Sequence, residues 1–310
     1  MALIRIGTRG SPMALAQTYQ VRDRLVAAHP DLAEPGAIEV CVIQTTGDKV
    51  QDRPLAAIGG KGLFTKEIEE GQVDGSLDMA VHSMKDVPTW LPQGLDIVCL
   101  LPRDDPRDGF ISYKAKNLAD LPSGSVIGTA SLRRQAQILA RRPDLRVVPF
   151  RGNANTRLRK LGEGQVDATL LAVCGMQRLG MPEVVTCTLS REEMLPAVAQ
   201  GAIGVECRAD DTAMRARLAP LHDRRTEICV AAERALLRVL DGSCRTPIAA
   251  LAELGPDERL TLAGLVIKPD GSLRYEAARS GLASDAERLG ADAGDELKRR
   301  AGPAFLDALA

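Results

Sequence analysis

The hydrophobic pattern of the chain alternates short apolar runs with helical segments, and it does so twice. Residues 4–17 read IRIGTRGSPMALAQ and residues 125–139 read SVIGTASLRRQAQIL, so each has an apolar strand, a serine and then a helix. Further on, GQVDGSLDMAV at 71–81 is echoed by GQVDATLLAV at 164–173. Short α/β segments can resemble one another by chance. The shared order nevertheless predicts two βαβ lobes of similar plan, ending near residues 100 and 195.

Each predicted lobe directs a helix N-terminus out of a strand-to-helix turn. Ser11 is expected to cap the first helix, with a proline at the first helical position, and Ser131 opens the second. Leu15, Tyr19 and Val26 fall in one narrow sector of the first helix and give it an apolar face. Helix N-termini attract anions, and in open α/β sheets the ligand crevice lies beyond the strand ends. The pattern therefore predicts an anion-binding cleft between two lobes.

The pattern changes after the stretch LPAVAQGAIGVECRADD at 195–211. The segment IGVEC at 203–207 is expected to be a strand that returns to a lobe already built. A helix at 228–240 and three strands follow, and a Pro-Asp-Gly turn precedes the last strand. We expect three domains: domain 1 at 1–101 and 201–220, domain 2 at 102–200, and a smaller α+β domain 3 with a three-stranded antiparallel sheet at 221–310.

Composition supports a globular protein of more than one domain. The chain has 310 residues, of which 45% are hydrophobic and 26% charged. The only apolar run near the start contains Arg5 and Arg9, so we expect neither a signal peptide nor a membrane span. The seven cysteines include no C-x-x-C pair, and the three histidines are dispersed. These features favour reduced thiols in the cytoplasm and no metal site.

The net charge of −1 conceals a strongly basic segment at 125–160. Eight arginines and Lys160 stand there against Asp144 alone, so nine positive charges less one negative leave an excess of +8. A solvated basic face would explain this excess. A site for a polyanionic ligand would explain it as well, because guanidinium groups bind carboxylates and phosphates bidentately.

Two further stretches carry candidate chemistry. In AVHSMKDVP at 80–88, Ser83, Lys85 and Asp86 follow an apolar strand directly. Asp86 could cap the turn before Pro88, or it could act in a ligand site. The glycine-rich GGKGLF at 59–64 is no P-loop, and both a mobile lid and a ligand contact remain open for it.

Many ordered motifs together resemble the porphobilinogen deaminase family along nearly the whole chain. They are GTRGSPMALAQ, GGKGLFTKEIE, AVHSMKDVP, PRDDPRDGF, IGTASLRRQAQ, RGNANTRL, LAVCGMQRLG, LPAVAQGAIGVECR and GSCRTPI. The resemblance implies an α/β fold in which two lobes like type II periplasmic binding proteins surround a cleft, with a smaller α+β third domain.

The resemblance also implies an activity. Four porphobilinogen molecules are joined head to tail into hydroxymethylbilane, with release of ammonia, as a step of haem and other tetrapyrrole biosynthesis. The product grows on a dipyrromethane cofactor, one per chain, held by a thioether to Cys244. A thiolate suits this attachment because sulfur is a soft nucleophile. For the other six cysteines we expect buried, small hydrophobic residues.

The resemblance assigns a set of site residues. Asp86 matches the catalytic aspartate, which serves first as an acid and then as a counter-ion. Porphobilinogen is the expected partner, with no metal, nucleic acid, membrane or obligate protein partner, and we expect a monomer. The cofactor-binding residues are Cys244, Lys85, Ser131, Arg133 and Arg134. The substrate-binding residues are Arg9, Ser11, Lys61, Phe64, Ser83, Arg151, Arg157, Arg178 and Gln200.

Three positions depart from the family pattern, and two rival functions remain. Ala57 stands where a lysine is often found, and Ala199 and Ser243 replace usual glycines. These replacements suggest that neither turn needs a glycine-only backbone angle. A solute receptor would share the two-lobed plan but has no use for a cofactor on Cys244. Nucleic-acid binding is disfavoured, because only 3% of residues are aromatic.

Overall fold

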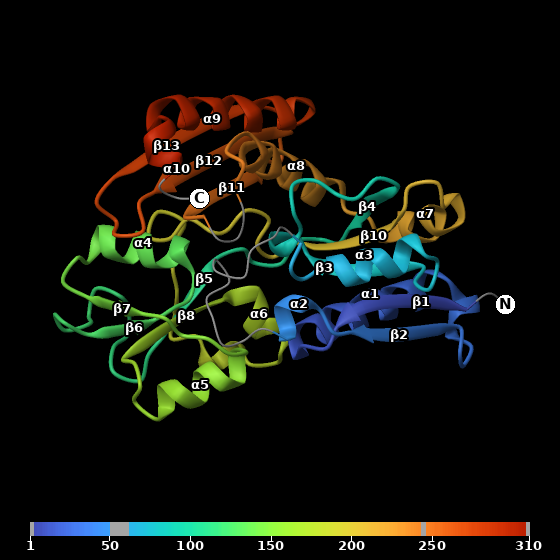
Figure 1. Cartoon of the computed structure of the whole chain (residues 1–310), viewed down its shortest axis with the longest axis horizontal. Coiled ribbons are helices and arrows are strands. Elements are labelled where there is room, and N and C mark those ends of the chain that lie inside the picture. The colour runs from blue at the N-terminus through green and yellow to red at the C-terminus, as the bar shows by residue number, and fades with distance from the viewer. Residues whose placement is uncertain (1–2, 50–61, 243–245, 308–310) are drawn as a thin grey trace. The chain divides into compact units, whose positions relative to one another are not determined.

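The computed structural model of the chain describes residues 3–49, 62–242 and 246–307 (Figure 1). The chain divides into two compact units. Unit 1 comprises Met1–Asp104 and Ala202–Glu227, and unit 2 comprises Asp105–Gly201 and Ile228–Ala310. The chain thus leaves unit 1, builds unit 2 and returns once before its C-terminal part. The three predicted domain boundaries stay predictions.

Unit 1 is built on a five-stranded sheet in the order β2-β1-β3-β10-β4. β1 is parallel to β2 and β3, whereas β10 is antiparallel to both β3 and β4. The predicted return of the chain through 203–207 is therefore confirmed. The strands are β1 (Ile4–Arg9), β2 (Ile38–Ile43), β3 (Met79–Ser83), β4 (Leu95–Leu100) and β10 (Ile203–Arg208); the helices are α1 (Pro12–Ala28), α2 (Thr46–Lys49), α3 (Lys66–Val73) and α7 (Thr212–Leu218).

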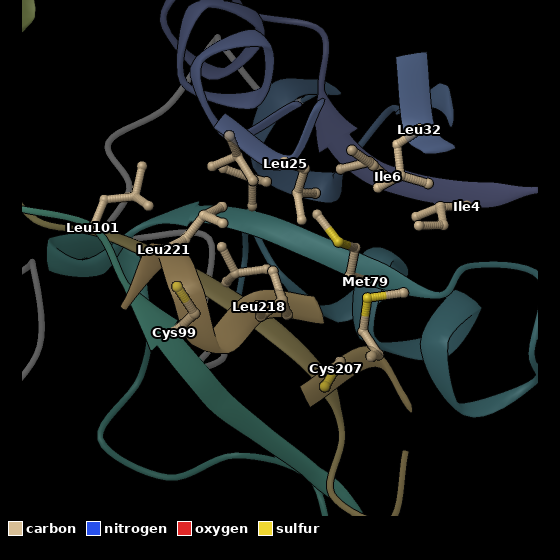
Figure 2. Packing of buried hydrophobic residues seen from close by; sticks show 14 of the residues in the cluster. Ile4, Ile6, Leu25, Leu32, Met79, Cys99, Leu101, Cys207, Leu218 and Leu221 are labelled. Carbon is tan, nitrogen blue, oxygen red and sulfur yellow. The ribbon is translucent and has the colours of Figure 1, made fainter. Parts of the chain in front are cut away.

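The core of unit 1 lies between this sheet and helices α1 and α7. Ile6 and Met79 of the sheet, Leu25 of α1 and Leu218 of α7 are fully buried together (Figure 2). The predicted apolar face of α1 is wrong at Tyr19, which is 41% exposed. α1 instead buries Gln17, Thr18, Val21 and Leu25. The first two of these make hydrogen bonds with Ser83 and Thr8 of the sheet, so polar partners set the buried face.

Unit 2 begins with a second five-stranded sheet, in the order β7-β6-β8-β5-β9. β6 is parallel to β7 and β8, and β5 is antiparallel to β8 and β9, so the order and directions repeat those of unit 1. The prediction of two lobes of similar plan is confirmed. The elements are β5 (Asp108–Ile111), β6 (Val126–Gly128), β7 (Arg146–Val148), β8 (Ala168–Ala172), β9 (Cys187–Thr188), α4 (Leu132–Arg141), α5 (Ala154–Gly162) and α6 (Val173–Arg178).

The C-terminal part of unit 2 contains a three-stranded antiparallel sheet in the order β11-β12-β13, as predicted. α9 lies along β12 and β13 (Figure 1). Together with the two similar lobes, this sheet confirms the predicted fold class. The elements are α8 (Arg224–Val239), β11 (Ile248–Leu254), β12 (Arg259–Ile267), β13 (Arg274–Leu282), α9 (Ala286–Ala301) and α10 (Pro303–Asp307).

The described residues contain neither a membrane-spanning helix nor a cluster of metal-binding side chains. Within residues 3–49, 62–242 and 246–307, each helix is too short or too polar to cross a membrane. In the same part of the chain, no three His, Cys, Asp or Glu side chains are placed to share a metal ion.

Candidate active site

In unit 1, strand β3 ends in a tight turn that presents Asp86. Ser83 is the last strand residue, and a 3-10 turn follows over Met84–Asp86. Met84 is buried, and its N–H donates to the Ala202 carbonyl at 3.1 Å. The turn leaves Lys85 exposed and Asp86 half-buried. A buried residue thus holds a turn whose next two side chains are accessible.

The Asp86 carboxylate has no hydrogen-bond or ion-pair partner among the residues that the structure describes, and the same is true of Lys85. If Asp86 capped its own turn, its carboxylate would accept a backbone N–H there. The described residues provide no such bond. A carboxyl group without an internal partner can exchange its proton with a ligand.

Ser83 is fixed by a residue that the sequence reasoning missed. Gln17, buried on α1, donates from Nε2 to Ser83 Oγ at 2.8 Å, and Ser83 Oγ lies 3.0 Å from Gln17 Oε1. Gln17 ends the motif GTRGSPMALAQ, and a glutamine among small apolar residues was the available signal. Ser11 opens the same helix as predicted, with Oγ accepting the Ala14 N–H at 3.2 Å.

Arg9 contacts both Phe64, which was predicted with it, and Asp48, which the sequence reasoning missed. The Arg9 guanidinium binds the Asp48 carboxylate bidentately, with Nε 3.1 Å from Oδ2. Its Cζ lies 4.1 Å from the centroid of the Phe64 ring, as in a cation–π contact. Burial alone would raise the pKa of Asp48, but the bonds from Arg9 hold this pKa below its ordinary value. Lys61, predicted beside them, lies outside the described residues.

A buried cluster of ionisable side chains lies elsewhere around β3. His82 Nε2 is 2.8 Å from Glu206 Oε2 of β10, and both side chains are almost fully buried. Burial raises the pKa of nearby Glu69 on α3, and the Glu206 carboxylate raises it further. None of these three residues was predicted as a site residue. Their spacing along the chain offers no signal, because three separate elements contribute them.

In unit 2, a buried aspartate binds two of the predicted arginines. Asp108 opens β5 and is fully buried. It accepts from Arg133 Nη1 at 2.7 Å, from Arg134 Nη2 at 2.7 Å and from Gln200 Nε2 at 3.0 Å. Burial alone would raise the pKa of Asp108, but the two guanidinium groups hold it well below its ordinary range. Four residues from three separate motifs therefore form one hub.

Both hub arginines are fixed by α4, which Ser131 caps as predicted. Ser131 Oγ accepts the Arg134 N–H at 3.4 Å. Arg134 Nη1 donates to the Leu170 carbonyl at 2.8 Å, and Arg133 Nη1 donates to the Leu195 carbonyl at 2.9 Å. Arg133 and Arg134 are only 5% and 7% exposed. Arg133 Nε has no partner among the described residues, so one buried donor is still unsatisfied.

A second group of arginines adds charge to this region. Arg157, on α5, donates from Nε to the Gly152 carbonyl at 2.9 Å. Burial, together with the charges of Arg134 and Arg151, lowers the pKa of Arg157 to about 10. The guanidinium groups are therefore close enough to repel one another. An anionic ligand would relieve that repulsion.

The turn over 198–201 overturns one expectation. Ala199 has φ of +57°, in the left-handed region that favours glycine. The expectation that this turn needs no such angle is wrong: the backbone keeps it, and an alanine adopts it. Gln200, the next residue, is 1% exposed, and Arg178 Nη2 donates to the Gly201 carbonyl at 2.6 Å. The matching expectation for Ser243 lies outside the described residues, as does Ala57.

The cysteines divide into two classes. Cys244 lies outside the described residues. Cys99, Cys174, Cys207 and Cys229 are buried, as expected, whereas Cys41 and Cys187 are only half-buried. Burial raises the pKa of Cys99 to about 12 and that of Cys207 to about 11. Such thiols are poor nucleophiles at neutral pH.

Two family models cover most of the chain. Residues 4–216 match "Porphobilinogen deaminase, dipyromethane cofactor binding domain" and residues 227–299 match "Porphobilinogen deaminase, C-terminal domain". The chain belongs to the porphobilinogen deaminase family. A chloroplastic porphobilinogen deaminase from rice, Oryza sativa subsp. japonica, is 57% identical over 100% of this chain and 87% of the relative. A porphobilinogen deaminase from Paracoccus denitrificans is 55% identical over 98% and 96%.

Solved structures of solute-binding proteins resemble this chain only distantly. A periplasmic substrate-binding protein of an ABC transporter from Coxiella burnetii is 16% identical with a TM-score of 0.43, over 71% of this chain and 92% of that protein. The methionine-binding protein MetQ is 14% identical with a TM-score of 0.42, over 70% and 89%. The assignment of the fold rests on the sheet order described above.

Proposed function

We propose that this protein joins four porphobilinogen molecules head to tail into hydroxymethylbilane, with Asp86 as its catalytic residue. The environment of the Asp86 carboxylate supports this assignment most strongly. It is half-buried at the end of β3, and it has no partner among the described residues. The buried Met84 behind it holds the turn in place. Membership of an enzyme family disfavours the solute-receptor and nucleic-acid-binding alternatives.

Asp86 has two tasks in this reaction. Ammonia can leave porphobilinogen only from the protonated, ammonium form of its amino group. The Asp86 carboxyl group would donate the extra proton to the amino group, or hold the ammonium group in place by a hydrogen bond. Departure of ammonia leaves a positively charged pyrrole carbon. The Asp86 carboxylate then stabilises that charge. Lys85, exposed beside it, is placed to bind a carboxylate of the ligand.

The arginine-rich region of unit 2 fits a dipyrromethane cofactor. Arg133 and Arg134 carry two positive charges, and Asp108 supplies one negative charge against them. The Nε donor of Arg133 is buried and unsatisfied among the described residues. Carboxylate side chains of a cofactor would supply both the missing charge and the missing acceptor. Cys244 would hold the dipyrromethane, which when bound would supply the acceptor pyrrole for chain growth.

The remaining predicted residues suit substrate carboxylates. Each porphobilinogen unit adds an acetate and a propionate, so a growing product needs several cationic or polar partners. A charge-assisted hydrogen bond contributes about 1.5 to 3 kcal/mol. We assign substrate binding to Arg9, Ser11, Lys61, Phe64, Ser83, Arg151, Arg157, Arg178 and Gln200. We also place the enzyme in haem biosynthesis, in the cytoplasm and as a monomer.

Intact-mass spectrometry of the native protein tests the cofactor attachment. The wild type, made in cells that synthesise porphobilinogen, should carry an adduct of two pyrrole units. Cys244→Ala should lack the adduct. Cys187→Ala, in which a half-buried thiol of the same unit is removed, should keep it. An unmodified wild type would overturn the proposed attachment.

A further inference from the structure

The strained turn next to Gln200 is held by a buried carboxylate outside the proposed site. Glu233, on α8, is fully buried. Its Oε2 accepts the N–H of Ala199 at 2.6 Å, and its Oε1 accepts the N–H of Ala252 in β11 at 2.8 Å. Figure 1 shows α8 next to β11. One carboxylate therefore joins the turn to the three-stranded sheet.

The bond to Glu233 stabilises Ala199 in an unfavourable, left-handed backbone conformation. A residue other than glycine with φ of +57° meets steric resistance from its own Cβ. Such a conformation persists only where surrounding contacts enforce it. The short bond from the Ala199 N–H to a buried carboxylate supplies such a contact, and the bond from Arg178 to the Gly201 carbonyl supplies another.

The turn over 198–201 also positions the side chain of Gln200. Its Nε2 donates to the Pro106 carbonyl at 2.6 Å and to Asp108 Oδ1 at 3.0 Å. Asp108 is the carboxylate that binds Arg133 and Arg134. A continuous chain of bonds therefore runs from Glu233 through the turn and Gln200 to the hub.

We propose that Glu233 is a positioning residue, which fixes the left-handed Ala199 turn so that Gln200 holds Asp108 and its two arginines in register for ligand binding. The effect on catalysis rests on the proposed function, whereas the effect on the arginines does not. Glu233→Gln keeps the shape but replaces one acceptor oxygen by an NH₂ group, which faces an N–H donor. Ala199→Gly removes the steric resistance, so the turn then depends less on Glu233.

The first measurement is the rate at which phenylglyoxal modifies each arginine of the native protein, followed by peptide mass spectrometry. Arg133 and Arg134 should react slowly in the wild type. In Glu233→Gln they should react about tenfold faster, the equivalent of one weakened charge-assisted hydrogen bond. In Ala199→Gly/Glu233→Gln the rate should fall to within about threefold of the wild type. Glu276→Gln, an exposed glutamate of unit 2, is the control and should change nothing.

The second measurement is steady-state kinetics with porphobilinogen. KM should rise about tenfold in Glu233→Gln, with a much smaller change in kcat. In Ala199→Gly/Glu233→Gln, KM should return most of the way to the wild-type value. Labelling that changes as expected while KM stays constant would overturn the role in the reaction. If even the wild type turns over no porphobilinogen, the proposed function fails, and the labelling result still decides the positioning.

Unchanged labelling in Glu233→Gln, or faster labelling that Ala199→Gly does not reduce, would overturn the proposal. Should Glu233→Gln fail to fold, the double variant is compared with Ala199→Gly alone. The expected difference in labelling is then about threefold, and equal rates would overturn the proposal.

Discussion

The strand-to-helix turns of the two similar sheets differ in where they carry their arginines. In unit 1, Arg9 precedes the capping serine, and it is bound to Asp48 and stacked on Phe64 while about a quarter of its side chain stays exposed. In unit 2, Arg133 and Arg134 follow the capping serine and are buried against Asp108. The same backbone plan therefore gives one open pair and one buried hub.

The two units also differ in how their charged side chains are paired. Unit 1 pairs Arg9 with Asp48 and Arg5 with Asp78, and leaves Asp86 without a partner among its described residues. Unit 2 sets two buried arginines against one aspartate and adds Arg157, whose pKa is lowered by burial and by its basic neighbours. Unit 1 thus keeps an acid available, and unit 2 keeps a surplus of positive charge. A polycarboxylate ligand and an acid-catalysed loss of ammonia require both.

The largest expected effect is at the acid. Asp86→Asn keeps the shape of the side chain but can neither donate a proton nor carry a negative charge, so kcat should fall by about 10² to 10⁴. Ammonia release in single-turnover experiments measures this loss. Asp96→Asn, at an exposed carboxylate of unit 1 that binds Arg215, is the control and should behave like the wild type. Near wild-type ammonia release by Asp86→Asn would contradict the assignment.

The second effect contrasts the buried hub with the open pair. Asp108→Asn leaves two buried guanidinium groups without their counter-charge, so the free energy of unfolding should fall by about 3 to 5 kcal/mol. Asp48→Asn breaks a partly exposed pair, so it should cost about 1 kcal/mol or less. Urea unfolding at pH 7 measures both. Equal losses would show that the two turns are held alike.

The third effect tests the surplus charge of unit 2. Arg157→Ala should raise KM for porphobilinogen about tenfold, because one charge-assisted hydrogen bond is lost. Its free energy of unfolding should stay within about 0.5 kcal/mol of the wild type, because the removed charge was repelled by its neighbours. Arg159→Ala, at an exposed arginine of the same helix that pairs with Glu163, is the control. A large loss of stability without a change in KM would assign Arg157 to the fold instead.

The sequence predicted the features that repeat along the chain. Ser11 and Ser131 cap their helices, the two lobes are of similar plan, and the C-terminal strands form a meander. Each of these follows from local chemistry, since a cap, a turn or a strand is decided within a few residues. The site residues came from the resemblance to a family and stay proposals.

The features that the sequence did not reveal depend on partners far along the chain. Asp108 is one of three aspartates in PRDDPRDGF, and only its position at the start of β5 buries it beside Arg133 and Arg134. Gln17 and Asp48 were missed for the same reason. Ala199 misled in another way, because its identity suggested a relaxed turn, whereas its neighbours force the left-handed angle.

The smallest expected effect concerns the buried carboxylates of unit 1. Glu69 has a raised pKa because of burial and of nearby Glu206, so its ionised form is penalised in the native state. For an acid of raised pKa, the native state is favoured below the ordinary value of about 4.5, and this advantage is lost as pH rises through the native pKa. Glu69→Gln cannot ionise, so it should avoid that loss.

The free energy of unfolding of Glu69→Gln, relative to the wild type, should therefore increase from pH 4 to pH 8, by on the order of 1 kcal/mol. Urea unfolding across this range measures the difference. Glu70→Gln removes a negative charge from the exposed side of the same helix and serves as the control. A difference that shrinks as pH rises would mean that the ionised Glu69 stabilises unit 1. Its charge would then be balanced by a neighbouring cation, as the charges of Asp48 and Asp78 are.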